Sequence, residues 1–215
     1  MVRRLLGHLL QFQRQLGSTT LTMSASSVKV KSPSVHNLVW IDMEMTGLDV
    51  QNDKILEIAC IVTNKNLELL EPGIDIVIHQ PEEVLGMMND WCVINHGKSG
   101  LTQAVRNSRV GLSEAEEIVL EFVKKHCPPK GCPLAGNSVY MDRMFLANYM
   151  PRLNDYLHYR IVDVSTIKEL CKRWNGAVFS RVPSKQLNHR ALDDIGESIK
   201  ELRFYRPYMF ADKKP

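Results

Sequence analysis

Residues 38–63 read LVWIDMEMTGLDVQNDKILEIACIVT and hold two apolar runs joined by polar turn residues. The first run, from Leu38 to Ile41, ends at Asp42 and predicts a central strand, because short apolar runs bounded by turn residues are typical of buried strands. Residues 47–49 provide the turn, and residues 55–63 predict a second strand rich in β-branched side chains. Residues 74–79 (IDIVIH) alternate and predict a third strand. We therefore expect the fold to begin with a three-stranded meander.

Helices and strands alternate in the rest of the chain. Pro81 followed by two glutamates favours a helical first turn, and Ser113 with Glu116 forms a capping-box pattern that opens a helix through Lys125. Further elements are predicted as a strand at 133–136, a helix at about 142–149, a strand at 159–164, and helices at about 166–174 and 190–205. Residues 175–188 show no clear pattern. This order indicates an α/β fold, a mixed central sheet with helices on both faces.

The charge distribution limits the kind of substrate. Residues 1–36 contain five of the 27 basic residues and no acidic residue, so the remaining chain holds 22 basic against 24 acidic residues. A protein that grips long nucleic acid through many phosphates carries a basic surplus or stripe. We therefore expect no long nucleic acid as a partner. No apolar run approaches the roughly 20 residues of a membrane-spanning helix, so no membrane partner is expected either.

The first 36 residues look like a processing segment. Arg3, Arg4 and Arg14 interleave with leucines in a stretch that is rich in Ser and Thr and free of acids. This profile is typical of a mitochondrial transit peptide, with a disordered leader as the alternative. Met23 offers a second start that would give a cytoplasmic form beside the mitochondrial matrix form. We expect one domain at 37–210, followed by a tail at 211–215.

Asp42 and Glu44 are the first candidate site residues. Because side chains two apart on a strand point to the same face, both carboxylates lie on one side of the first strand. Neighbouring carboxylates repel each other, and burying them without a partner is costly. A divalent cation such as Mg²⁺ or Mn²⁺ would stabilise the pair, since it prefers hard oxygen ligands. Taken alone, the pair could equally be a solvated strand end.

Two later motifs carry further candidates. Ser138 and Asp142 lie at a strand-to-helix junction, where Asp142 could also be an ordinary helix-start aspartate. His189 stands at the mouth of the last predicted helix, with Asp193 and Asp194 one turn inside it. A histidine titrates near neutrality and can serve as a general base, although one at a helix cap is often only a surface residue.

The order D-x-E, N-S-x-x-x-D and H-x-x-x-x-D resembles that of the DEDD superfamily of 3′→5′ exonucleases, in the subtype with histidine in its third motif. The stretches VWIDMEMTGLD, AGNS, YMP, HYRIVDVSTIKEL and HRALDDI are similar to the oligoribonuclease family within that group. The resemblance extends from about residue 39 to residue 205. It implies a ribonuclease-H-like fold and hydrolysis of short RNA, especially dinucleotides, to 5′-mononucleotides.

The resemblance also implies a catalytic set. The family's four acidic positions fall on Asp42, Glu44, Asp142 and Asp194, and its general base falls on His189. Two divalent cations, Mg²⁺ or Mn²⁺, would be held by these acids, with Asp42 bridging them. The motif spacing selects Asp194 over Asp193.

Substrate-binding positions carry over in the same way. Leu48 resembles the family's wedge between the two terminal bases, Trp91 its base-stacking aromatic and His96 the residue near the 3′ end. For Leu48 and Trp91 the alternative is simple core packing.

A second group matches the family's contacts to the other end of a dinucleotide. Ser138, Arg160 and Ser165 fall on its clamp for the 5′ phosphate. Tyr159 matches a residue that the neighbouring subunit contributes, which implies a homodimer with composite sites.

Two other functions fit the same residues. One is an exonuclease of this superfamily that trims longer DNA or RNA. The other is a catalytically silent RNA-binding or scaffold protein that retains the fold.

Overall fold

The computed structural model describes residues 32–184 and 190–210. Five strands form one sheet in the order β3-β2-β1-β4-β5. They are β1 (Leu38–Met45), β2 (Ile55–Thr63), β3 (Ile74–Val77), β4 (Pro133–Gly136) and β5 (His158–Asp163). The first three pair antiparallel, as the expected meander requires, and β4 and β5 are added in parallel. The prediction of a mixed sheet is confirmed.

Strand β1 continues beyond the apolar run that ends at Asp42. It pairs with β2 through Asp42↔Ala59 and Glu44↔Glu57, and an irregularity in register follows at Met45. The strand therefore includes both Asp42 and Glu44, as the prediction of their shared face requires. Strand β4 is shorter and ends at Gly136. The acidic end of β1 therefore extends past its parallel neighbour.

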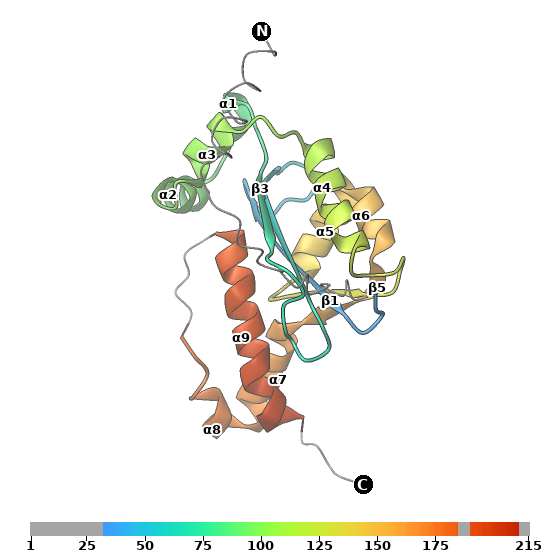
Figure 1. Cartoon of the computed structure of the whole chain (residues 1–215). Helices are drawn as coiled ribbons and strands as arrows, with labels where there is room; N and C mark the ends of the chain where they lie inside the picture. The colour runs from blue at the N-terminus through green and yellow to red at the C-terminus, as the bar shows by residue number, and fades with distance from the viewer. Residues whose placement is uncertain (1–31, 185–189, 211–215) are drawn as a thin grey trace, which may run out of the picture. The chain divides into compact units, whose positions relative to one another are not determined.

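Helices cover both faces of the sheet (Figure 1). On one face Val39, Ile41 and Met43 share an apolar core with residues of three helices. These helices are α4 (Leu112–Lys124), α5 (Tyr140–Tyr149) and α6 (Pro151–Tyr156). On the other face Trp40 shares a second core with residues of α7 (Val164–Trp174), α8 (Gly176–Phe179) and α9 (Ala191–Met209). Because strand side chains alternate, Asp42 and Glu44 lie on the α9 face, two and four residues after Trp40.

Three further helices lie at one end of the sheet (Figure 1). They are α1 (Glu82–Leu85), α2 (Asp90–Lys98) and α3 (Leu101–Asn107). Helices α1 and α3 form a small core with the sheet, in which Leu56 of β2 packs with Leu85 and Leu101. Only the first turn of α1 was predicted from the sequence. The sequence did not predict helix α2, because its Val93 and Ile94 are exposed and it has no clear apolar stripe.

The predicted capping box at Ser113 is wrong. Helix α4 begins one residue earlier, at Leu112, after Gly111. The Glu116 carboxylate instead accepts hydrogen bonds from Arg152 Nε at 3.0 Å and from the Arg152 backbone N–H at 2.7 Å. Glu116 therefore joins α4 to the start of α6, a contact that local sequence cannot reveal. Within the described part of the chain, no helix is both long and apolar enough to cross a membrane.

Candidate active site

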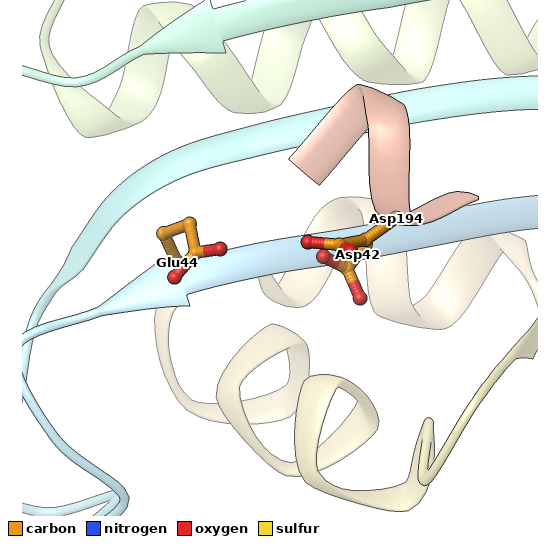
Figure 2. Close-up of side chains that lie close together, drawn as sticks. All are labelled: Asp42, Glu44 and Asp194. Carbon is orange, nitrogen blue, oxygen red and sulfur yellow. The ribbon is translucent and has the colours of Figure 1, made fainter. Parts of the chain in front are cut away.

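Three carboxylates converge on the α9 face of the sheet (Figure 2). Asp42 and Glu44 come from β1, and Asp194 comes from the first turn of α9. One oxygen from each lies within 4.8 Å of the others. Asp193, the competing aspartate, is exposed on the same turn. The structure thus brings Asp194 to the β1 pair, from more than 140 residues away in the chain.

The charges of this cluster oppose one another. Burial, and then the neighbouring Asp42 and Asp194, raises the pKa of Glu44 to about 8. Burial and then Asp42 likewise raise the pKa of Asp142 well above the usual range of a carboxyl group. Carboxylates this close cannot all ionise cheaply without a positive charge among them. The donor set therefore fits a hard divalent cation, which takes oxygen ligands.

Asp142 has a structural partner as well. It lies buried in the first turn of α5, and its Oδ1 accepts a hydrogen bond from the Met43 backbone N–H at 3.0 Å. This N–H lies beyond the end of β4, where β1 has no neighbouring strand on that side. Asp142 therefore fixes α5 to the acidic end of β1, although it is not one of the three carboxylates whose oxygens lie within 4.8 Å of one another.

A cleft of about 470 Å³ adjoins the acidic cluster. Glu44, Leu48, Trp91 and His96 line it, together with Met43, Met45, Gly47, Asn89 and Cys92. Leu48 is 67% exposed and Trp91 56% exposed, so neither is a core residue. The alternative of core packing for these two residues is therefore wrong.

His96 links the cleft to the carboxylates. It is 1% exposed, and its Nε2 lies 2.9 Å from the Met45 carbonyl oxygen. Its Nδ1 lies 3.7 Å from Glu44 Oε2. The Trp91 ring meets the His96 ring edge to face, with centroids 6.4 Å apart. Helix α2 thus presents an exposed aromatic at the rim and a buried imidazole beside Glu44.

Ser138 and Ser165 meet at the junctions that follow β4 and β5. The Ser138 backbone N–H donates to Asp163 Oδ1 and to Ser165 Oγ, both at 3.0 Å. The two hydroxyl oxygens lie 3.2 Å apart. Asp163 also accepts from the Ser165 N–H and so caps α7. Ser138 adopts a positive φ of 50°, which aims its N–H into this turn.

Arg160 and Tyr159 lie on β5, at the edge of the sheet. Tyr159 is 72% exposed, and the Arg160 guanidinium carbon lies 5.2 Å from the centroid of its ring. His189 lies outside the described residues, between the described Ser184 and Arg190.

Two asparagines belong to this region and were not singled out from the sequence. Asn89 lines the cleft and accepts from the Cys92 N–H at 2.9 Å, so it caps α2. Asn137 donates to Ser198 Oγ of α9 at 2.7 Å and accepts from Ser165 Oγ at 3.1 Å. An asparagine before an acidic first turn is a helix-start signal that could have found Asn89.

The chain is similar to proteins of known function over most of its length. A family model described as "Exonuclease" matches residues 39–202. "Oligoribonuclease, mitochondrial" of Mus musculus is 48% identical over 93% of this chain and 84% of the relative. "Probable oligoribonuclease" of Dictyostelium discoideum is 52% identical over 90% of this chain and 99% of the relative. A relative from Chromobacterium violaceum, named oligoribonuclease, is 50% identical over 80% and 95%.

Solved structures with the same fold are more distant in sequence. Exonuclease I of E. coli in complex with single-stranded DNA matches with a TM-score of 0.65 at 15% identity over 83% of this chain. Exonuclease I of Methylocaldum szegediense matches with a TM-score of 0.63 at 18% identity over 80%. The chain spans about two fifths of the length of both proteins, 41% in each case. These matches confirm the ribonuclease-H-like fold.

Proposed function

Because this chain belongs to the oligoribonuclease family of exonucleases, we propose that it is a 3′→5′ exoribonuclease that hydrolyses short RNA to 5′-mononucleotides. The observation that carries the proposal is the meeting of Asp42, Glu44 and Asp194 beside a cleft with an exposed aromatic at its rim. Hydrolysis at the end of an RNA chain needs metal-binding carboxylates beside a cleft that accepts a base, and this region supplies both.

The acidic residues form the metal centre of the proposed reaction. Asp42, Glu44 and Asp194 would hold one divalent cation, and Asp142 would support a second ion from the start of α5. Mg²⁺ or Mn²⁺ suits these hard oxygen ligands. When bound, two such ions stabilise the attacking water and the departing 3′ oxygen of an in-line displacement. The pKa of Glu44, which burial and then Asp42 and Asp194 raise to about 8, supports this assignment, because a bound cation would stabilise the ionised carboxylate.

His189 is proposed as the general base that accepts the proton of the attacking water. Its position in the chain supports the role, because it precedes by five residues the Asp194 that joins the cluster.

The cleft suits the 3′ end of a very short RNA. Trp91 offers a ring on which a base stacks, Leu48 inserts between the two terminal bases, and His96 approaches the 3′ end. Stacking contributes about 1–3 kcal/mol per base and reads no sequence, because every base has an aromatic face. A binding site that relies on stacking accepts all dinucleotides.

The other end of a dinucleotide would be held by a phosphate clamp. Ser138 and Ser165 present adjacent hydroxyl groups, and Arg160 offers the planar fork that matches phosphate oxygens. We propose that Tyr159 completes this clamp from the neighbouring subunit of a homodimer with composite sites. The exposure of Tyr159 on an edge strand supports this, because exposed strand edges are surfaces for pairing with another chain.

The proposed location is mitochondrial. The relatives from mouse and human are both named as mitochondrial. We propose residues 1–36 as a transit peptide, with a cytoplasmic form that starts at Met23 and a catalytic domain at 37–210.

The purified protein should be tested on 5′-labelled RNA of two and of twenty nucleotides, with and without Mg²⁺. We expect metal-dependent loss of the dinucleotide that is much faster than attack on the twenty-mer. Equal rates would retain an exonuclease but favour one that trims longer nucleic acid. An unchanged dinucleotide after long incubation with Mn²⁺ would favour the catalytically silent RNA-binding protein.

A further inference from the structure

A carboxylate is buried in β2, close to the proposed metal centre. Glu57 is completely buried in a strand whose other residues are almost all apolar. Its Oε1 accepts from Arg190 Nε at 2.9 Å and from Arg190 Nη2 at 2.5 Å. Its Oε2 accepts from the Ala191 backbone N–H at 3.0 Å. Both oxygens are therefore engaged by the first residues of α9.

This contact fixes the start of the helix that carries Asp194. Arg190 is the N-cap residue of α9, and Glu57 takes the place of a local side-chain cap by binding the Ala191 N–H. A negative charge at a helix N-terminus is also favourable because it faces the positive end of the helix dipole. Arg190 Nη2 lies 3.3 Å from Asp75 Oδ2 as well, so the guanidinium spans β2 and β3.

The register of the sheet relates this contact to the acidic cluster. Glu57 lies directly opposite Glu44 across the β1–β2 pair, and such cross-strand neighbours share a face of the sheet. Asp194 lies four residues after Arg190, one turn further along α9. Glu57, opposite Glu44 on the neighbouring strand, therefore binds the N-terminus of the helix that carries Asp194.

Stability alone does not explain a charged pair at this place. A buried ion pair loses hydration that its mutual attraction only partly offsets, and well-packed apolar residues often replace such pairs without loss of stability. What the pair supplies is a fixed geometry, because the guanidinium fork and the helix N–H bind a single carboxylate together.

We propose that Glu57 and Arg190 are positioning residues, which hold α9 so that the Asp194 carboxylate meets those of Asp42 and Glu44 at the metal centre. This rests on the proposed function for the identity of the centre. Outer partners that orient metal ligands commonly change metal affinity or activity by about 10–100-fold when they are replaced. We expect changes of that size here.

The test uses the full chain and measures the dissociation constant of Mn²⁺ by titration calorimetry, beside kcat and KM on a dinucleotide. Arg190→Lys keeps the charge but removes the fork, and Glu57→Gln removes the charge. We expect each to raise the Mn²⁺ dissociation constant and to lower kcat by about 10-fold or more, with KM nearly unchanged. The double variant should resemble the single variants, because the two residues act as one unit.

The matched control is a second carboxylate–guanidinium pair, on the opposite face, in which the glutamate is again buried. Glu116 and Arg152 join α4 to α6 with Nε and Oε2 3.0 Å apart, far from the acidic cluster in the fold. Glu116→Gln should lower the melting temperature and leave Mn²⁺ binding unchanged.

Wild-type Mn²⁺ affinity in a folded Arg190→Lys protein would overturn the proposal, even if Glu57→Gln failed to fold. A loss of affinity in Glu57→Gln alone would mean that only charge matters, which also overturns it. Failure of the proposed function is a separate outcome, because the wild-type protein would then bind Mn²⁺ without cleaving RNA.

Discussion

The backbone N–H of Met43 donates a hydrogen bond to the Oδ1 atom of Asp142 at 3.0 Å. One aspartate thus completes the hydrogen bonding of β1 and places a carboxylate at the acidic cluster. Asp142→Asn keeps an acceptor oxygen for the Met43 N–H but removes the negative charge. We expect this variant to be at least as stable as the wild type in the absence of metal, because it loses a buried carboxyl group whose pKa is raised, and to lose most of its dinucleotide hydrolysis.

Asp142→Ala separates the two roles of the residue. Without an acceptor, the Met43 N–H is left unsatisfied in a buried place, which costs about 1–3 kcal/mol. The free energy of unfolding, measured by denaturant titration, should therefore fall in Asp142→Ala but not in Asp142→Asn. Equal stability of the two variants would show that the hydrogen bond contributes nothing.

The pH dependence of stability should reveal the raised pKa of the Glu44 carboxyl group. Burial raises its pKa from the ordinary 4.5 to about 8, so between these values the folded protein keeps a proton that the unfolded chain has lost. The free energy of unfolding of the metal-free protein therefore falls as pH rises through this window. Glu44→Gln does not titrate, so its free energy of unfolding relative to that of the wild type should rise by on the order of 3–4 kcal/mol between pH 5 and pH 8.

Metal binding should show the complementary trend. A bound cation requires the ionised form of Glu44, so binding releases a proton below about pH 8. The affinity for Mn²⁺, measured by calorimetry, should rise with pH and level off near pH 8. A flat profile between pH 6 and pH 8 would contradict protonation of this carboxylate in the metal-free protein.

Trp91 should contribute to binding rather than to stability. Since it is 56% exposed at the rim of the cleft, Trp91→Ala removes little buried area. Loss of one stacked base should raise KM for a dinucleotide by about 5- to 150-fold. Trp174→Ala is the matched control, because Trp174 is 72% exposed at the end of α7 and does not line the cleft. Similar effects of both substitutions would remove Trp91 from the substrate site.

Arg160 tests the phosphate clamp. Arg160→Ala should slow cleavage of a 5′-phosphorylated dinucleotide more than cleavage of longer oligomers, because only the dinucleotide places its 5′ phosphate in the clamp. A dinucleotide with a 5′ hydroxyl should be almost insensitive to the substitution. If all three substrates slow by the same factor, Arg160 acts on the fold and not on the phosphate.

The sequence predicted the sheet because its strands carry local signals. Residues 55–63 are rich in apolar and β-branched side chains apart from Glu57, and they form β2 with the predicted bounds. Helix α2 gave no such signal, because its exposed Trp91, Val93 and Ile94 break the helical period of apolar residues. A sequence pattern that detects buried faces misses a helix whose apolar side chains are exposed in this way.

The candidate site was predictable only in part. Alternation placed Asp42 and Glu44 on one face, and motif spacing selected Asp194. The contact of Arg190 with Glu57 joins residues 133 positions apart, and no local pattern gives it. A glutamate within an otherwise apolar strand was nevertheless a signal that Glu57 would need a buried partner.

The most direct test of the metal centre compares two adjacent aspartates. Asp194→Asn and Asp193→Asn should be assayed on a dinucleotide over a range of Mg²⁺ concentrations. Only Asp194 joins Asp42 and Glu44, so we expect Asp194→Asn to lower the rate by about 100-fold or more, while Asp193→Asn stays near wild type. A near-wild-type rate in Asp194→Asn, or an equal loss in both variants, would contradict a metal centre built on Asp42, Glu44 and Asp194.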